Sequence, residues 1–451
     1  MNEKKAVKAF VVAGVSSGSG KTTVVGAIAA ALVERGLTVQ IYKVGPDYID
    51  PGHHRAITGR PVRSLDIWMM GEEGIRANFC RGLQGADVAI VEGVGGLFDG
   101  LGTTELASTA QVAKILNLPV VLVADAWGMS RSAAALVKGF RDFDPHLTLA
   151  GVVFNLVGSE GHAKLLEDSI RPLGVELLGH ILRRRKGAIP ERHLGLKLAQ
   201  ELDWDSRLEV LRGLASGLRI DTMLELATDV EGIFPVRPWV SSPFGSRKVA
   251  VARDAAFAFA YHESLEAIEE AGGELLFFSP LQGDGIPSQA ESLYLPGGYP
   301  ELHGESLETN HRFRRDIEEM VASNCPVYAE CGGLIYLANK VEYKGRVFRM
   351  AGVFPVNISF GGRPLLGYAV GIAKENHPFL GRGSEVRGHV FHYSVAQVFG
   401  EVRHPYLLRV PTRGIEVEEG YTKGNTIATY LHLNLAFALG ILEGLWGGYG
   451  G

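Results

Sequence analysis

Hydrophobic residues in the first half of the chain form short uninterrupted runs, which alternate with segments in which apolar residues recur at helical spacing. The first run covers residues 9–13 and is followed, after a glycine-rich turn, by a helical pattern over residues 22–35. Further apolar runs, each typical of a buried strand, cover residues 39–44, 88–91, 120–124 and 151–157. Strands and helices that alternate in this way predict an α/β fold with a doubly wound, mostly parallel sheet.

The pattern is interrupted between residues 233 and 246, where three prolines occur and neither helical nor strand periodicity continues. We interpret residues 233–246 as a linker between a first domain at 1–232 and a second domain at 247–451. The second domain begins with a strand, a helix and another strand, expected over residues 249–252, 264–271 and 274–278.

The composition limits the classes of partner. Lys and Arg total 45 against 50 Asp and Glu, the net charge is −5, and the basic run at 183–186 is short. We therefore expect no nucleic-acid or membrane partner. The three cysteines are too few for a disulfide framework, and neither a signal peptide nor a membrane-length apolar run is recognisable. These features predict a cytoplasmic protein, and the sequence leaves a homodimer open.

A phosphate-binding loop is predicted between the first strand and the first helix. Residues 14–23 read Gly-Val-Ser-Ser-Gly-Ser-Gly-Lys-Thr-Thr, a composition that lets backbone amides surround a polyphosphate. Five residues separate Gly14 from Gly20, one more than in the usual motif, so the alternative is an ordinary glycine-rich turn. We expect ATP to contact Gly14, Ser16, Gly18, Gly20, Lys21, Thr22 and Thr23.

Acidic residues follow two of the predicted strands. Glu92 ends the strand at 88–91, and Asp47 follows the strand at 39–44. Carboxylates at the carboxyl edge of a parallel sheet are suited to bind Mg²⁺ beside a nucleotide, together with Thr22. Asp50 is compatible with the same role or with a solvated loop. Lys43, at the end of its strand, is a candidate contact to a phosphate or to a substrate carboxylate.

A cysteine nucleophile is predicted in the second domain. An apolar strand runs directly into a helix with Cys331 at the joint, and the small residues Ala329 and Gly333 flank it as in a nucleophile elbow. The helix N-terminus would lower the pKa of the thiol. Backbone amides near Gly298 and Gly332 are expected to form an oxyanion hole.

A thiol nucleophile needs a base, and three histidines of the second domain are candidates. His432 lies in an apolar strand about a hundred residues after the cysteine, and it is favoured over His389 and His392.

These motifs together resemble those of the glutamine-dependent cobyrinate a,c-diamide synthase family, over nearly the whole chain. The two most specific segments are Lys-Val-Gly-Pro-Asp-Tyr-Ile-Asp-Pro at 43–51 and Val-Glu-Gly-Val-Gly-Gly-Leu-Phe-Asp-Gly at 91–100. The lengthened phosphate loop is similar to that of dethiobiotin synthetase-like enzymes. In the second half the resemblance rests on residues 251–257, 296–301, 328–333 and 388–393.

The resemblance implies a P-loop, dethiobiotin synthetase-like domain that forms amides with ATP, followed by a class I glutamine amidotransferase domain of flavodoxin-like α/β fold. It implies that Asp47 and Glu92 bind Mg²⁺, that Asn155 contacts adenine and that Tyr48 lies beside substrate or phosphate. It also implies that Cys331 is the glutaminase nucleophile.

One departure from the wider amidotransferase superfamily concerns the base that the resemblance implies, His432. A glutamate usually follows this histidine by two residues, and the chain has Asn434 there. The resemblance therefore leaves open which group orients the imidazole.

The implied activity is amidation of the a- and c-acetate groups of cobyrinate, with ammonia from glutamine and an acyl phosphate made from ATP. Nickel-sirohydrochlorin and hydrogenobyrinate are alternative macrocycles. A P-loop regulatory or partitioning ATPase with an inactive amidotransferase-like module is a more distant alternative. A dethiobiotin synthetase-like carboxylase is another, but it would not need residues 247–451.

Overall fold

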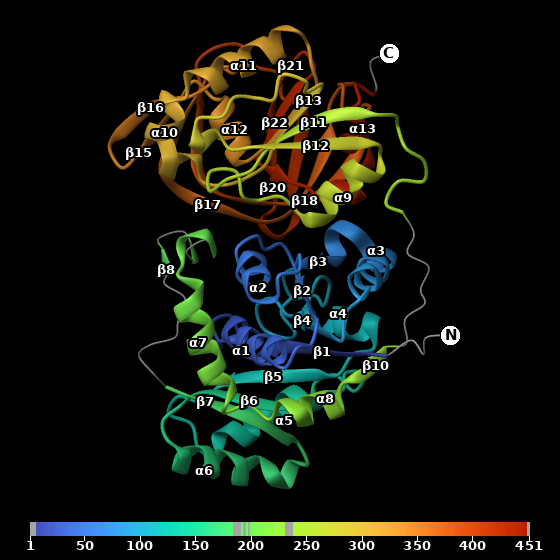
Figure 1. Ribbon diagram of the computed structural model, residues 1–451, viewed down its shortest axis with the longest axis vertical. Coiled ribbons are helices and arrows are strands. Elements are labelled where there is room, and N and C mark those ends of the chain that lie inside the picture. Colours follow the sequence, from blue (N-terminus) through green and yellow to red (C-terminus); the bar gives the residue numbers. More distant parts are fainter. Residues whose placement is uncertain (1–5, 184–190, 193–194, 197–198, 231–237, 449–451) are drawn as a thin grey trace. The chain divides into compact units, whose positions relative to one another are not determined.

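The computed structural model describes residues 6–183, 191–192, 195–196, 199–230 and 238–448 (Figure 1). The chain divides into two compact units, Met1–Arg237 and Pro238–Gly451. Within the described ranges, no helix combines the length and the apolar character that a membrane span requires.

A mostly parallel sheet forms the centre of the first unit, as the alternating pattern predicts. Its main path has the order β3-β2-β4-β1-β5-β6-β7, all parallel, and β10 pairs antiparallel with β1. The strand order reverses around β1, so the loops after β1, β4 and β5 meet at the carboxyl edge where α/β proteins bind ligands. The strands are β1 (Val7–Gly14), β2 (Val39–Val44), β3 (Arg63–Leu65), β4 (Val88–Glu92), β5 (Val120–Asp125), β6 (Leu149–Val157), β7 (Glu176–Leu182) and β10 (Thr228–Val230).

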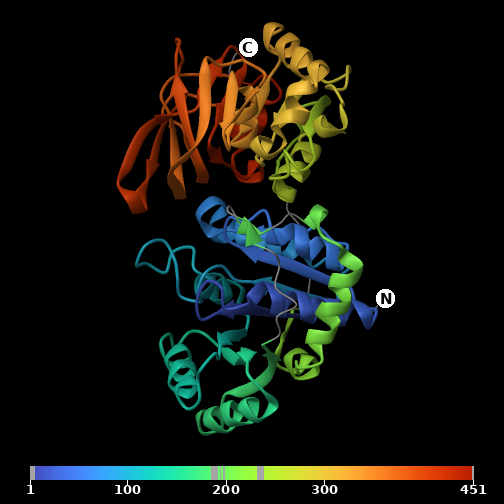
Figure 2. The same cartoon turned by 90° about the vertical axis from the view of Figure 1, so that its left-hand side faces the viewer.

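Helices connect these strands and bury their apolar sides on the sheet. Helix α1 (Lys21–Glu34) packs Val24, Ile28 and Leu32 into one core with Phe10 and Val12 of β1. It also packs against α2 and α7, whereas α5 and α6 pack against each other (Figure 2). The other helices of this unit are α2 (Asp50–Thr58), α3 (Ile67–Gly82), α4 (Thr109–Leu116), α5 (Ser132–Asp142), α6 (Glu160–Ile170), α7 (Trp204–Ala215) and α8 (Ile220–Leu226), and a two-stranded ribbon joins β8 (Glu191–Arg192) to β9 (Gly195–Leu196).

The second unit contains a six-stranded sheet with the order β12-β11-β13-β14-β22-β21, parallel except for β21. Its core includes Phe313 and Tyr336, whose rings stack with centroids 4.7 Å apart. The strands are β11 (Arg247–Ala252), β12 (Gly273–Phe278), β13 (Ser292–Leu295), β14 (Val327–Glu330), β21 (Tyr421–Lys423) and β22 (Thr426–Thr429). The helices are α9 (His262–Glu270), α10 (Gly304–Thr309), α11 (His311–Ala322), α12 (Gly332–Leu337) and α13 (Leu439–Gly444).

A further, mostly antiparallel sheet in the second unit was not predicted from the sequence. Its long strands are β17 (Val356–Ala373) and β18 (Glu385–Val398), and β17 carries glycines, Pro364 and an irregular register between Phe360 and Leu365 that weaken the strand pattern. The remaining strands are β15 (Lys340–Tyr343), β16 (Arg346–Arg349), β19 (Tyr406–Val410), β20 (Ile415–Glu419) and β23 (Leu431–His432). Because β23 pairs with β18, His432 lies opposite His389.

The described part of the predicted linker, residues 238–246, packs on the second unit instead of standing free. Trp239 is buried, its indole N–H donates to Glu266, and its ring meets Phe437 edge-on at 5.2 Å. Phe244 makes a similar contact with Trp446 at 5.5 Å. Residues 233–237 of the predicted linker lie outside the described ranges.

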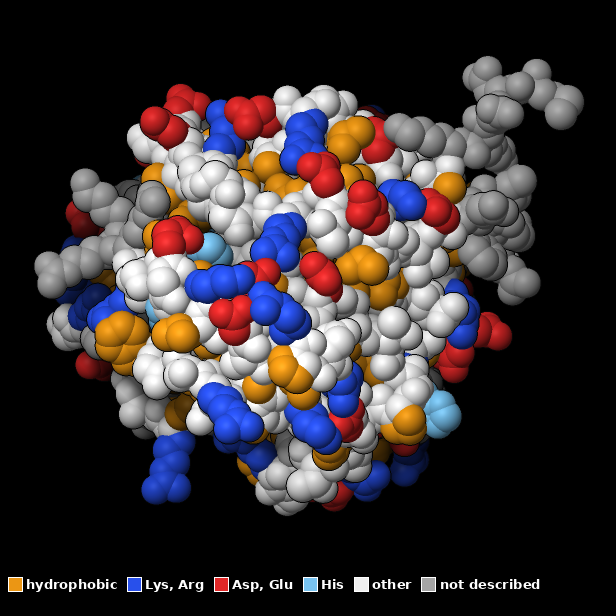
Figure 3. Space-filling model, turned by 90° about the horizontal axis from the view of Figure 1, so that it is seen from below, with side chains coloured by type: hydrophobic (Ala, Val, Ile, Leu, Met, Phe, Trp, Pro, Cys, Tyr) orange, Lys and Arg blue, Asp and Glu red, His pale blue; other side chains and the backbone are white. Residues whose placement is uncertain are grey.

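Charged side chains of both signs lie interspersed on the face shown in Figure 3. Part of the exposed charge is paired, as in Lys138 with Asp142 on α5 and Arg219 with Glu167.

Candidate active sites

The phosphate loop lies where the sequence predicts it, between the end of β1 at Gly14 and the start of α1 at Lys21. Gly18 and Gly20 adopt φ values of 77° and 97°, in the left-handed region that favours glycine. A Cβ on Gly20 would lie 2.1 Å from Nδ2 of Asn155, so this position also lacks room for a side chain. The turn therefore presents backbone amides and the start of a 14-residue helix to the carboxyl edge of the sheet.

Lys21 lies inside this loop. Its ammonium donates to the carbonyl oxygens of Ser16 at 3.1 Å and Gly95 at 2.5 Å. Burial and the nearby charge of Lys43 lower the pKa of Lys21. The lysine is thus held between the phosphate loop and the loop after β4, while Ser16 is exposed and Thr23 is half-buried.

A cluster of charged side chains surrounds the hydroxyl of Thr22. This hydroxyl donates to Oε1 of Glu92 at 2.7 Å and to Oδ2 of Asp50 at 3.2 Å. The ammonium of Lys43 lies 2.6 Å from the same Asp50 oxygen and 2.8 Å from the same Glu92 oxygen. Four elements, α1, β2, α2 and β4, therefore bring one cation, two carboxylates and one hydroxyl together at the carboxyl edge of the sheet.

The charges in this cluster compensate one another. Burial alone would lower the pKa of Lys43, but the carboxylates of Glu92, Asp50 and Asp47 raise it well above its ordinary value. Burial would raise the pKa of Glu92, but Lys43 and His54 together hold it below its ordinary value. The Lys43 ammonium therefore forms ion pairs with the carboxylates around it.

Asp47 occupies a different position from Asp50, although the sequence favours Asp47 as a ligand. Its Oδ1 accepts hydrogen bonds from the amides of Ile49 and Asp50, and its Oδ2 lies 3.5 Å from the Lys43 ammonium. Burial and the neighbouring Asp50 raise the pKa of Asp47 to about 7. Asp50 is the carboxylate on this segment that reaches Thr22, and its position at the start of α2 explains why the loop pattern alone did not distinguish it.

Asn155 and His54 complete the surroundings of the phosphate loop. The side-chain amide of Asn155 donates to the carbonyl of Ser19 at 3.0 Å, so a hydrogen bond connects β6 to the loop. Nε2 of His54 contacts Oε2 of Glu92, and this contact to the β4 carboxylate was not predicted from the sequence. Tyr48 is half-buried in the same segment as Asp47.

The predicted cysteine elbow is present in the second unit. Cys331 follows β14, precedes α12 and has φ 41° and ψ −92°, a conformation that is rare for a residue with a side chain. Its amide donates to the carbonyl of Thr429 at 2.7 Å on the neighbouring strand. Strain of this kind at the joint of a strand and a helix is typical of an exposed or poised nucleophile.

The Gly297–Gly298 turn brings the other predicted residues around this elbow. A Cβ on Gly332 would lie 2.7 Å from the amide nitrogen of Gly298, so the two glycines of the predicted oxyanion hole are adjacent. A Cβ on Gly297 would lie 2.4 Å from Cε1 of His432. The turn after β13 therefore contacts both the residue after the cysteine and the ring of the favoured histidine.

The thiol pKa differs from the sequence expectation. Burial raises the pKa of Cys331, and the carboxylates of Glu301 and Glu330 raise it further. The expectation that the thiol pKa is lowered was wrong for the resting site, because burial and the two carboxylates outweigh the opposite effect of the Gly332 amide. The resting thiol is protonated at neutral pH and needs a base for attack.

The histidines near the cysteine are uncharged at neutral pH. Burial, with a smaller effect of His392, lowers the pKa of His432 to about 3. Burial lowers the pKa of His392 to about 4, and the ring of His392 stacks on Tyr430. His389 stacks on His432 with centroids 4.9 Å apart, and its Nε2 is 3.0 Å from the hydroxyl of Tyr261. His432 is therefore a neutral imidazole, and His389 packs on it.

Two buried glutamates beside the cysteine were missed by sequence reasoning. Glu330 precedes Cys331 directly, and its Oε2 lies 3.9 Å from Nδ1 of His432. Glu301, in the 3₁₀ turn Pro300–His303, is 3% exposed, and burial raises its pKa to about 8. The only sequence signal for either residue is that it lies next to a motif already singled out.

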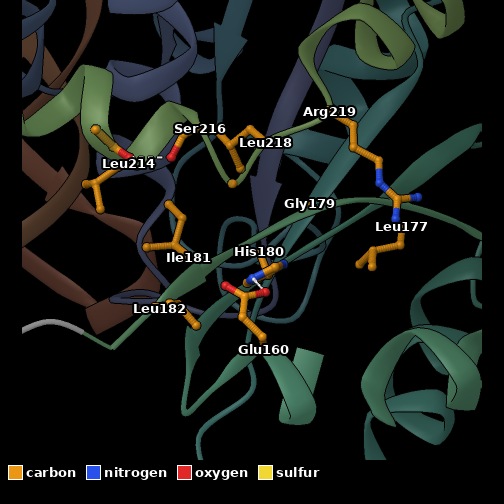
Figure 4. A pocket seen from close by; sticks show the side chains of 12 residues that line it. Glu160, Leu177, Gly179, His180, Ile181, Leu182, Leu214, Ser216, Leu218 and Arg219 are labelled. Carbon is orange, nitrogen blue, oxygen red and sulfur yellow. Dashed lines mark hydrogen bonds and ion pairs between the residues drawn. The ribbon is translucent and has the colours of Figure 1, made fainter. Parts of the chain in front are cut away.

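A pocket of about 330 Å³ in the first unit lies away from the predicted residues. It is lined by β7 and by the segment 213–219, and Figure 4 shows Glu160 and His180 side by side at its wall, with 3.1 Å between Oε2 of Glu160 and Nε2 of His180.

Comparison with known proteins finds a different family model for each of the two units. A family model described as the CobQ/CobB/MinD/ParA nucleotide binding domain matches residues 10–196, and one described as the CobB/CobQ-like glutamine amidotransferase domain matches residues 248–437. A cobyrinate a,c-diamide synthase from Syntrophotalea carbinolica is 40% identical, and the alignment covers 95% of each chain. The chain belongs to the cobyrinate a,c-diamide synthase family.

Other relatives agree with this assignment. A cobyrinate a,c-diamide synthase from Listeria innocua is 38% identical, over 97% of this chain and 98% of its own. A hydrogenobyrinate a,c-diamide synthase from Streptomyces coelicolor is 38% identical, over 97% of this chain and 96% of its own. The predicted family, fold class and enzyme class, a glutamine-dependent ligase with a nucleotide-binding domain, are confirmed.

Proposed function

We propose that this member of the cobyrinate a,c-diamide synthase family converts the a- and c-acetate groups of cobyrinate into amides, with ATP and glutamine as co-substrates, and that it acts in the cytoplasm. The observation that carries the proposal is the pairing, on one chain, of a complete phosphate loop with a strained cysteine elbow, in a family whose named relatives include cobyrinate a,c-diamide synthases.

In the first unit, the phosphate loop and Lys21 bind the ATP phosphates. A substrate carboxylate oxygen attacks the γ-phosphorus, the bond to the β,γ-bridging oxygen breaks, and ADP leaves behind an acyl phosphate. Ammonia then attacks the acyl carbon, phosphate departs, and a proton is lost to give the amide. Lys21 supports this role because its ammonium already lies within the loop. Asn155 adjoins the loop and remains the expected adenine contact.

Residues around Thr22 fit a magnesium ion. Its hydroxyl lies within hydrogen-bonding distance of the carboxylates of Asp50 and Glu92, and all three groups are hard oxygen donors of the kind that Mg²⁺ prefers. In the described part of the chain, no group of three or more His, Cys, Asp and Glu side chains is arranged to hold a metal, so phosphate oxygens would supply further ligands. When bound, Mg²⁺ neutralises phosphate charge. Asp47 stays a predicted ligand, and Tyr48 a predicted substrate contact.

In the second unit, His432 accepts the thiol proton while Cys331 Sγ attacks the carboxamide carbon of glutamine. Amides at the Gly298–Gly332 junction stabilise the oxyanion, the C–N bond breaks, and ammonia leaves after His432 returns the proton. Water then hydrolyses the thioester to glutamate. Burial leaves His432 uncharged at neutral pH, as a base must be before it accepts a proton.

The identity of the macrocyclic substrate is the more specific part of the proposal. Cobyrinate is favoured because it appears in the names of several relatives, whereas hydrogenobyrinate appears in the name of the Streptomyces coelicolor relative and nickel-sirohydrochlorin remains an alternative from the sequence. The test is an assay with MgATP, glutamine and each macrocycle in a separate reaction, in which ADP, glutamate and product mass are followed. We expect two successive replacements of OH by NH₂ on cobyrinate. ADP release without amide on any macrocycle would contradict the proposal.

A further inference from the structure

The sequence leaves open which group orients the imidazole of His432. In the wider amidotransferase superfamily that the sequence resembles, a glutamate follows the histidine by two residues, and here that position is Asn434. The Asn434 side chain is engaged locally, because its Oδ1 accepts the amide of Ala436 at 3.2 Å and caps the 3₁₀ turn Leu435–Phe437. The Oδ1 of Asn434 is therefore used in the backbone turn and not at the ring of His432.

Glu330 is placed to face it. Oε2 of Glu330 lies 3.9 Å from Nδ1 of His432, and the two side chains are 0% and 2% exposed. The ring is also fixed from other sides, by the stacked ring of His389 and by the close approach of Gly297. At 3.9 Å the two atoms are beyond hydrogen-bonding distance, so the carboxylate of Glu330 acts on the ring through its charge, which favours a proton on Nδ1.

Three hydrogen bonds hold the Glu330 carboxylate in this place. Its Oε1 accepts from the hydroxyl of Tyr328 at 2.9 Å and from the amide of Leu433 at 3.1 Å, and its Oε2 accepts from the hydroxyl of Tyr294 at 3.1 Å. Leu433 directly follows His432, so one side chain connects the strand that leads into the nucleophile with the backbone of the base.

We propose that Glu330 is the positioning residue that orients His432 and stabilises its imidazolium form during glutamine hydrolysis, in place of the missing glutamate. This inference rests on the proposed glutaminase roles of Cys331 and His432. Transfer of the thiol proton to His432 creates a positive charge in a buried site, and the nearby carboxylate of Glu330 offsets the cost of that charge.

The state of the Glu330–His432 pair depends on pH. Burial raises the pKa of Glu330 to about 8, and burial lowers the pKa of His432, so the carboxylate becomes available as pH rises. We expect kcat for glutamine hydrolysis to rise as the pH increases through the pKa of Glu330. Other titratable groups around the pair are Tyr294, Tyr328, Cys331, His389, His392 and Tyr406.

The test uses the full chain with Glu330→Gln, which keeps the shape of the side chain and removes its charge. We expect kcat for glutamine hydrolysis to fall roughly a hundredfold, with KM changed less than about threefold, because the loss concerns the transition state. Amide formation with added ammonia should stay within about twofold of wild type, and the rise of kcat with pH should shift or disappear.

Glu419→Gln is the matched control. Glu419 is another buried carboxylate of this unit, whose Oε2 accepts from the hydroxyl of Thr429 at 2.6 Å and whose Oε1 accepts from the amide of Tyr430. Burial raises the pKa of Glu419 to about 7, so the pH profile of this variant serves to separate the titration of Glu419 from that of Glu330, and its kcat for glutamine hydrolysis should stay within about threefold of wild type. If Glu330→Gln does not fold, Tyr294→Phe replaces it, because loss of the donor to Oε2 should lower glutamine-dependent kcat about tenfold without affecting the ammonia-dependent reaction.

The inference is overturned if Glu330→Gln, or Tyr294→Phe in its place, retains glutamine turnover and pH profile within about threefold of wild type. It is also overturned if glutamine- and ammonia-dependent rates fall together, as a purely structural role predicts. Failure of the underlying function is distinguishable, because wild type and Cys331→Ala would then hydrolyse glutamine equally slowly.

Discussion

The two sites handle charge in opposite ways. Around Thr22, buried charges compensate one another, since Lys43 lies between the carboxylates of Asp50 and Glu92. Around Cys331, burial shifts each ionisable group toward its neutral form, as the pKa values of Cys331, His432 and Glu330 indicate. The first arrangement suits binding of a polyphosphate, and the second suits a nucleophile that is activated only when substrate arrives.

The two sites also differ in how the chain assembles them. Most of the phosphate site is local, because Gly14 to Thr23 form one turn and one helix start. The cysteine site depends on distant pairing, since β22 and β23 bring Thr429 and His432 beside Cys331 and Gly297. Local motifs can be recognised in a sequence more readily than juxtaposed strands.

The largest effect that separates the two sites is expected from a pair of variants. Cys331→Ala should lower glutamine-dependent amidation by a factor of about a thousand or more, while amidation with ammonia persists. Lys21→Ala should lower amidation with either nitrogen source at least about a hundredfold, because charge on the transferred phosphoryl group is no longer neutralised. Product formation and glutamate release, measured separately, check both. Equal loss of both nitrogen sources in Cys331→Ala would contradict the assignment.

A second variant tests how much the paired charges around Lys43 contribute to the stability of the first unit. Lys43→Met leaves Asp50 and Glu92 buried without their shared cation, which should cost about 3 kcal/mol of the stability of the first unit. Denaturant unfolding measures this. Lys8→Met is the control, because its ion pair with Asp229 is exposed and should contribute at most about 1 kcal/mol. A Lys43→Met variant as stable as the control would show that the cluster does not need the ammonium.

A smaller effect is expected in the chemistry of the resting thiol. Because the pKa of Cys331 is raised, its thiolate fraction at neutral pH is low, and alkylation of Cys331 by iodoacetamide should be slower than that of free glutathione. The rate should increase as pH rises toward the thiol pKa. Peptide mapping separates Cys331 from Cys80 and Cys325. If Cys331 were alkylated faster than glutathione at neutral pH, the result would contradict the raised thiol pKa and support the lowered pKa that the sequence suggested.

The sequence predicted the parallel sheet of the first unit, the glycine-rich turn between β1 and α1, and the strand-to-helix joint at Cys331. The roles expected of these residues and of His432 stay predictions. The sequence did not predict the antiparallel sheet around β17 and β18, because glycines and Pro364 obscure the strand pattern. It favoured Asp47 over Asp50, since the first turn of α2 that directs Asp50 toward Thr22 is not visible as a motif. Contacts such as Glu330 with His432 join residues about a hundred positions apart, and periodicity carries no information about them.

The most direct test of the account is to follow nitrogen from one site to the other. The enzyme is given cobyrinate, MgATP and glutamine labelled with ¹⁵N in its amide, and the product is analysed by mass spectrometry. The account predicts that both new amides carry ¹⁵N in wild type, and that Cys331→Ala, supplied with unlabelled ammonia as well, gives only unlabelled amides. Labelled product from Cys331→Ala, or ADP and glutamate without labelled amide from wild type, would contradict it.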